Sequence, residues 1–121
     1  MFNDYTTLAE FSREGFDIIV DKTWEDMPIA DCFDDSCYDI RDMERRVNKG
    51  DLDWFQVRVR AQLSGLTLGI SSLGGCMYER AEEILTDGVV EDLVGEAINE
   101  ARTTAASLKS KLEKIVDNVC V

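Results

Sequence analysis

The clearest alternation of apolar and polar positions lies in WFQVRVRAQL, residues 54–63. Every second residue is apolar, which is the period of a half-buried β-strand. Ser64-Gly65 follows and can form a two-residue turn, so the pattern predicts a hairpin over about 54–71. A turn at this position sets three expected pairs on one face of the hairpin, namely Leu63 with Leu66, Ala61 with Leu68, and Val59 with Ile70.

The opposite face of this hairpin is expected to show Trp54, Arg58 and Arg60. We expect the two arginines to neutralise carboxylates of the chain itself and not to read a ligand. A second alternating stretch, FDIIVD at 16–21, is the candidate for a third strand.

Three shorter segments read as helices. Thr7 followed by Glu10 matches a capping box, which predicts a helix that ends at Gly15. Residues 36–47 read as a helix stopped by Asn48 and Gly50. Gly74-Gly75 is expected to end the hairpin's second strand, and a helix is expected over about 78–86, closed by Asp87-Gly88.

A sustained helical stripe runs to the end of the chain. Apolar residues recur at steps of three and four from Val90 to Val119, close to heptad spacing, which predicts a helix over about 89–119. Such a helix is about 45 Å long, more than a domain of this size can cover. Part of the stripe should therefore meet another chain, as in a homodimer, or the helix should break near Arg102-Thr103-Thr104.

These elements indicate a single domain over residues 1–121 in the α+β class. The expected fold is a small antiparallel sheet packed with helices, followed by the long C-terminal helix. A chain of 121 residues with 45% hydrophobic residues is long enough for one modest core.

The net charge narrows the classes of partner. A formal charge of −12 opposes direct binding to nucleic acid, because the phosphates repel it, and favours basic partners. The N-terminal sequence MFNDYTTLAEF lacks the features of a signal peptide, and no apolar run is long enough to span a bilayer. We expect a cytoplasmic protein without membrane contact.

Metal binding and catalysis are not expected, and no cofactor is implied. A calcium loop started at Asp31 fails, because its third and sixth positions are Phe33 and Ser36. The chain has no histidine, the residue most often used in acid/base catalysis near neutral pH. Its four cysteines are Cys32, Cys37, Cys76 and Cys120, and this spacing does not form two close pairs for zinc.

The carboxylates fall in two blocks, 21–44 and 79–100, each with a net charge of −7. Either the blocks form a protein-binding surface that imitates a polyanion, or they only keep the chain soluble. If residues 31–42 were helical, five aspartates would share one face. The candidate partner-binding residues are Asp31, Asp34, Asp35, Asp39 and Asp42, then Glu79, Glu82, Glu83, Glu91, Asp92 and Glu96, with Trp24 either an interface anchor or a core residue.

Two segments of the chain, 53–78 (DWFQVRVRA through LGGCMY) and 88–102 (GVVEDLVGEAINEAR), are similar to small phage and prophage proteins. In its size and acidity, the chain resembles the small phage-encoded counter-defence proteins, which include anti-CRISPR proteins and DNA-mimicking antirestriction proteins. The resemblance implies stoichiometric binding inside a bacterial cell to a nuclease or a nucleic-acid-guided complex. Arg58, Arg60 and the basic C-terminal turns depart from a uniformly anionic mimic.

The sequence therefore predicts a non-enzymatic inhibitor that binds a basic, nucleic-acid-binding surface of a host defence complex through its acidic patches. The alternative is a structural or assembly protein that oligomerises through its long C-terminal helix.

Overall fold

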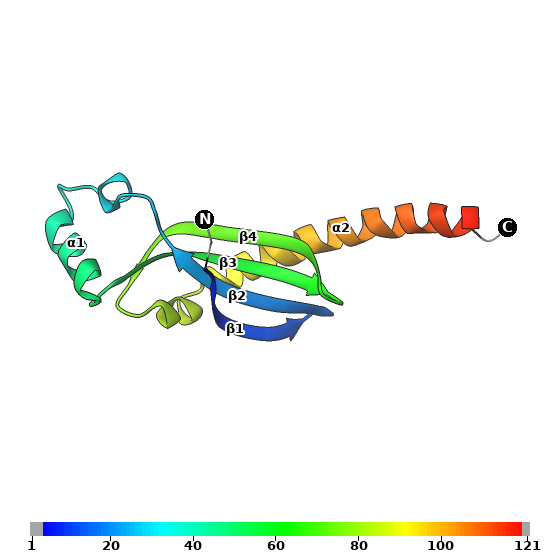
Figure 1. The fold of residues 1–121 in the computed structure, drawn as a ribbon, viewed down its shortest axis with the longest axis horizontal. Coiled ribbons are helices and arrows are strands. Elements are labelled where there is room, and N and C mark those ends of the chain that lie inside the picture. Colours follow the sequence, from blue (N-terminus) through cyan, green and yellow to red (C-terminus); the bar gives the residue numbers. More distant parts are fainter. Residues whose placement is uncertain (1–3, 120–121) are drawn as a thin grey trace.

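Four antiparallel strands form a meander in the computed structural model, which describes the backbone of residues 4–119 and the side chains of residues 4–117. The strands are β1 (Thr6–Arg13), β2 (Phe16–Trp24), β3 (Asp53–Leu63) and β4 (Leu66–Tyr78). They lie in the order β1-β2-β3-β4, so each strand pairs with its neighbour in the sequence (Figure 1). The α+β class is confirmed, with more strands than the sequence predicted.

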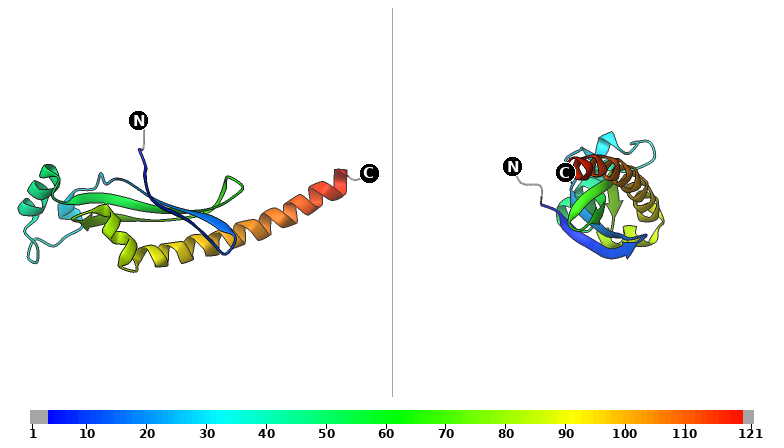
Figure 2. Two further views of the ribbon diagram at one scale, coloured as in Figure 1. Left: turned by 90° about the horizontal axis from the view of Figure 1, so that it is seen from below. Right: turned by 90° about the vertical axis from the view of Figure 1, so that its right-hand side faces the viewer.

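Two helical regions flank the sheet. The 3-10 helix η1 (Ile29–Asp31) and helix α1 (Ile40–Lys49) form a lobe beyond one end of the strands (Figure 1). The 3-10 helix η2 (Ala81–Thr86) leads into α2 (Val89–Val119), which crosses one face of the sheet and then extends past its other end (Figure 2). None of the helices among the described residues combines the length and the apolar character that a membrane span needs.

The core lies between α2 and the sheet face it covers. Alternate residues of β2 and β3 supply the sheet side, including the fully buried Ile18, Val57 and Val59. Val94 and Ala97 supply the helix side. This burial explains why the alternation in both strands was readable from the sequence.

The helix expected from the capping box at Thr7 is wrong, since this segment is strand β1. Phe11 pairs with Ile18 and Ala9 with Val20, which places both apolar residues on the α2 side of the sheet. A register shift between Thr7 and Ala9 interrupts the alternation that would have revealed a strand. Pairing with β2 therefore overrides the local helix signal.

The predicted hairpin over 54–71 exists, but its register was only partly right. Leu63 pairs with Leu66 as expected. An irregularity next to Ala61 then shifts the second strand by one residue, so Ala61 pairs with Gly69 and not with Leu68. Ile70 consequently lies opposite Arg60, on the face away from α2, and is exposed.

Two predicted boundaries were also wrong. Strand β4 continues through Gly74-Gly75 to Tyr78, because Gly75 adopts a positive φ of 68° at a second irregularity in the β3–β4 pairing. The helix expected over 78–86 is the shorter η2.

Helix α2 is continuous, so the break expected near Arg102-Thr103-Thr104 does not occur. The Arg102 side chain pairs with Glu14, in the turn between β1 and β2. The Thr103 hydroxyl donates a hydrogen bond to the Asn99 carbonyl within the helix. The stripe therefore extends beyond the sheet as one rod.

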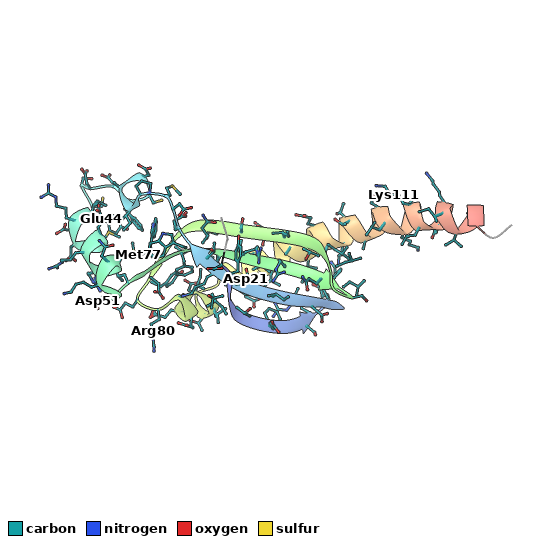
Figure 3. The ribbon with its side chains drawn as sticks, in the orientation of Figure 1. Asp21, Glu44, Asp51, Met77, Arg80 and Lys111 are labelled. Atoms are coloured by element: carbon teal, nitrogen blue, oxygen red, sulfur yellow. The ribbon has the colours of Figure 1, made fainter. Side chains whose placement is uncertain are left out.

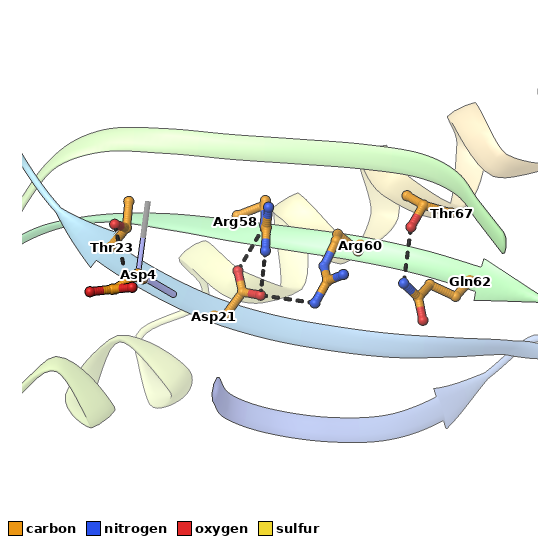
Figure 4. A network of polar contacts seen from close by, with 7 residues as sticks. All are labelled: Asp4, Asp21, Thr23, Arg58, Arg60, Gln62 and Thr67. Carbon is orange, nitrogen blue, oxygen red and sulfur yellow. Dashed lines mark hydrogen bonds and ion pairs between the residues drawn. The ribbon is translucent and has the colours of Figure 1, made fainter. Parts of the chain in front are cut away.

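The sheet face away from α2 carries an ion cluster on β2 and β3, in which Asp21 is buried and two arginines are partly exposed (Figure 4). Arg58 donates to both Asp21 oxygens, at 2.9 and 2.8 Å, and Arg60 Nη2 donates to Asp21 Oδ2 at 3.1 Å. The Arg58 guanidinium also stacks on the Tyr5 ring, 3.5 Å from its centroid. The expectation that these arginines neutralise the chain's own acids is confirmed.

Candidate functional site: the acidic segment and Trp24

The segment between β2 and α1 holds six carboxylates and no lysine or arginine over residues 25–39, which we call the acidic segment. Its members are Glu25, Asp26, Asp31, Asp34, Asp35 and Asp39. All except Glu25 are exposed. The segment contains no long helix or strand, so its shape depends on side-chain contacts with the sheet.

The Glu25 side chain makes the first of these contacts and anchors the segment to the sheet. The residue is only 4% exposed. One carboxylate oxygen accepts from the Gly75 amide at 2.6 Å, and the other accepts from Gln56 Nε2 at 2.8 Å. Burial tends to raise the pKa of Glu25, but its hydrogen bonds outweigh burial and leave the pKa below its usual value.

Aromatic and apolar side chains hold the rest of the segment. Trp54 is 4% exposed, and its indole Nε1 donates to the Met27 carbonyl at 2.9 Å. The Phe33 ring lies 6.0 Å from the Trp54 ring and 5.0 Å from the Tyr38 ring, centroid to centroid. Ile29 of η1 is buried. The acidic segment is therefore fixed against β3 and β4 at several points.

The five aspartates predicted from residues 31–42 do not share one helical face. Helix α1 begins only at Ile40, because Asp39 is its N-cap and accepts from the Asp42 amide at 3.1 Å. Asp34 accepts from the Ser36 amide at 2.9 Å in a turn, and this bond lowers the Asp34 pKa. Asp42 pairs with Arg45. Because of these local hydrogen bonds, the helix begins four residues later than the predicted start at Ser36.

The lobe is not uniformly negative. Helix α1 carries four basic residues, namely Arg41, Arg45, Arg46 and Lys49. The negative charge of the lobe is therefore concentrated in the acidic segment.

Trp24 lies at the start of this region and is 64% exposed, so it is not a core residue. Its ring lines a hollow of about 280 Å³ at the base of the lobe. The rim includes the carboxylates of Asp26 and Glu44, and neither has an ion-pair partner among residues 4–117. A large aromatic face beside unpaired carboxylates can hold a lysine or arginine side chain through charge and cation–π contact.

The second predicted group lies elsewhere. Glu79, Glu82 and Glu83 are exposed in and around η2, and Glu91, Asp92 and Glu96 are exposed on the first half of α2. Glu91 accepts from Arg13 Nη1 at 2.7 Å. Asp92, Glu96 and Glu100 form a row along one exposed side of α2. This row follows a different element from the acidic segment.

The cysteines show no feature of a reactive or metal site among the described residues. Cys32 and Cys37 are exposed free thiols, and burial raises the pKa of the Cys76 thiol to about 11. Cys120 lies outside the described residues. Within residues 4–119, no group of three or more carboxylate or thiol side chains is placed to hold a metal ion.

Replacing Glu25 with glutamine should lower the free energy of unfolding by about 2 kcal/mol, because glutamine keeps only one acceptor oxygen and its NH2 group would then face either the Gln56 or the Gly75 donor. The pKa of Glu25 in the folded state is below its ordinary value. The carboxylate therefore stabilises the fold fully at a pH above the ordinary pKa, and this stabilisation is lost as the pH falls through the folded-state pKa. Urea unfolding at neutral and acid pH measures both effects. Asp26→Asn, an exposed neighbour, is the control and should change stability by less than about 0.5 kcal/mol. Equal losses in the two variants would contradict the anchoring role of Glu25.

The sequence reasoning missed Glu25, Asp26 and Glu44 as parts of this site. Asp26 and Glu25 follow Trp24 directly in WEDMP, so their adjacency was a usable signal. Glu44 reaches the hollow only through the path of the lobe, which the sequence does not show. The chain matches no protein-family model, and comparisons with curated proteins and with solved structures find no similar chain.

Proposed function

We propose that this chain is a non-enzymatic binding protein that docks its acidic segment and Trp24 onto a basic surface of another protein. The observation that carries the proposal is the exposed Trp24 ring in a hollow rimmed by unpaired carboxylates. Tryptophan is among the residues that dominate interface energies, and carboxylates around it favour a cationic partner side chain.

The electrostatics support a fast and selective encounter. A chain with a charge of −12 is attracted to a basic surface over about a Debye length, so association accelerates at low salt. The same charge repels free nucleic acid. The chain therefore binds a basic surface on the partner. It competes there with the nucleic acid that such surfaces bind.

The partner class follows from that competition. Basic surfaces large enough to attract this chain are typical of proteins that bind nucleic acid. Together with the resemblance to phage counter-defence proteins, this supports action as an inhibitor of a bacterial defence complex, such as a nucleic-acid-guided nuclease. Occupation of the nucleic-acid site explains inhibition without catalysis.

Trp24→Ala should weaken binding to such a complex by about 30-fold, since loss of an interface hot spot costs about 2 kcal/mol. The unfolding free energy should stay nearly unchanged, because the ring is mostly exposed. The measurement is competition with DNA for purified nucleic-acid-guided nucleases over a salt series. The double variant Asp31→Asn/Asp35→Asn should also weaken binding, and with a reduced salt dependence.

The matched control is Glu10→Gln/Asp17→Asn, which removes two exposed carboxylates from β1 and β2; Asp17 lies at the end of β2 opposite to the acidic segment. It makes the same change in net charge and should bind like the unmodified chain. The proposal is wrong if the control loses as much affinity as the double variant, or if Trp24→Ala binds normally.

A further inference from the structure

The second half of α2 extends beyond the sheet, and no other part of residues 4–117 covers it. The helix has 31 residues and is about 46 Å long. Its sheet-facing residues are buried as far as Ala101, whereas every described residue from Ala106 to Asp117 is exposed. This end of the helix extends past the sheet (Figure 2). An isolated helix of about 12 residues is marginal in water. A second surface that covers this part would stabilise it.

The exposed part of α2 carries a groove on one side. The tip of the β3–β4 hairpin forms one wall with Leu63 and Leu66, and α2 forms the other with Leu108, Leu112 and Val116. The groove has a volume of about 730 Å³. Leu66 is 63% exposed and Leu112 is 55% exposed. Exposed apolar surface gathered in this way is typical of a protein–protein contact.

The charge distribution favours contact between copies at this groove over contact at the lobe. Residues 106–117 contain three lysines and two carboxylates, a net charge of +1 in a chain of −12. Lys111 lies toward the free end of α2, whereas Glu44 and Asp51 lie at the lobe, at the other end of the molecule (Figure 3). Two copies that meet through the end of α2 therefore keep their acidic segments far apart. Contact through the lobe would instead bring strong like charges together.

We propose that a second copy of this chain fills the groove in a two-fold symmetric dimer, with the exposed ends of the two α2 helices antiparallel. Such a contact is self-complementary, because each copy offers both the groove and the apolar helix that enters it. Leu112 of each copy lies close to the two-fold axis. This dimer goes beyond the proposed function and does not depend on it.

Sedimentation equilibrium of the full chain over a concentration series tests the dimer. The unmodified chain should approach twice the 13.7 kDa mass of one chain. Leu112→Lys should raise the dimer Kd by about 30-fold or more, because it places a charge at the centre of the contact. Leu66→Lys, on the opposite wall of the groove, should act in the same direction.

Ser107→Lys is the matched control, since it adds the same charge on the side of α2 away from the groove. It should leave the dimer Kd unchanged, and circular dichroism should show the same fold in all three variants. A monomer at every concentration overturns the proposal. So does a dimer that survives both Leu112→Lys and Leu66→Lys, while assembly beyond the dimer overturns the closed two-fold arrangement. The proposed function is tested separately, by measuring whether a monomeric variant still competes with DNA for the partner.

Discussion

Gly69→Ala should destabilise the protein by about 3 kcal/mol or more, the largest effect expected from the addition of one methyl group. A Cβ at residue 69 would lie 2.7 Å from the Ala101 amide nitrogen and would also overlap the Ala97 carbonyl. Both obstacles are backbone atoms, which cannot move aside without a shift of α2 away from β4. Overpacking of a core costs about 1–3 kcal/mol and sometimes more, so a clash with a helix backbone belongs at the upper end.

Gly95→Ala is the matched control for this prediction, because Gly95 lies on the exposed side of the same helix. A Cβ there meets nothing within 4 Å. The substitution should stabilise the protein by about 0.5–1 kcal/mol through helix propensity. Urea unfolding followed by circular dichroism measures both variants. If Gly69→Ala were as stable as the unmodified chain, the close approach of α2 to β4 would be wrong.

Asp21→Ala should cost about 3 kcal/mol of unfolding free energy. Asp21 is 1% exposed and accepts all three hydrogen bonds of the cluster on the open face of the sheet. These bonds also raise the pKa of Arg58. Without the carboxylate, two guanidinium groups would stay close together with no counter-charge. Loss of one partner from a buried ion cluster costs about 3–5 kcal/mol, and partial exposure of both arginines places this case at the low end.

The control is Asp17→Ala, four residues earlier on β2 and on the same face of the sheet. Asp17 is exposed, so its removal should change stability by less than about 0.5 kcal/mol. Thermal unfolding at matched ionic strength measures both. Equal melting temperatures for the two variants would show that the ion cluster adds nothing to stability.

The sequence was informative where one local pattern and the tertiary fold agree. The alternation in β2 and β3 and the long stripe of α2 match surfaces that are buried in the structure. The turn at Ser64-Gly65 was placed correctly, since Leu63 and Leu66 are paired. The expectation that Arg58 and Arg60 neutralise the chain's own acids is also met, since both pair with Asp21.

The sequence failed where the outcome depends on contacts between distant segments. Strand β1 looks like a helix until Phe11 pairs with Ile18. The shift beside Ala61 has no local signal, yet it exposes Ile70. The sequence predicts Trp54 on the face of the hairpin opposite its apolar residues and leaves Trp24 open, and only the path of the lobe determines that Trp54 is buried and Trp24 exposed. The hollow was unpredictable for the same reason.

If both proposals hold, the protein presents two copies of one acidic site at the far ends of a long particle. Two linked sites raise the apparent affinity only when a target offers two basic surfaces at the matching distance. A target with a single surface gains nothing from the second site. The monomeric Leu112→Lys variant would therefore lose apparent affinity for a target with two basic surfaces and retain it for a target with one.

The connection of each strand to its neighbour has a consequence for synthesis on the ribosome. All four strands precede α2 in the chain, so the residues of the meander are synthesised before the helix that covers them. At roughly 5–20 residues per second, the 31 residues of α2 take about 2–6 s to be translated. Until α2 packs against it, the apolar face of the sheet is uncovered, and such transiently exposed apolar surface makes a folding chain prone to aggregation.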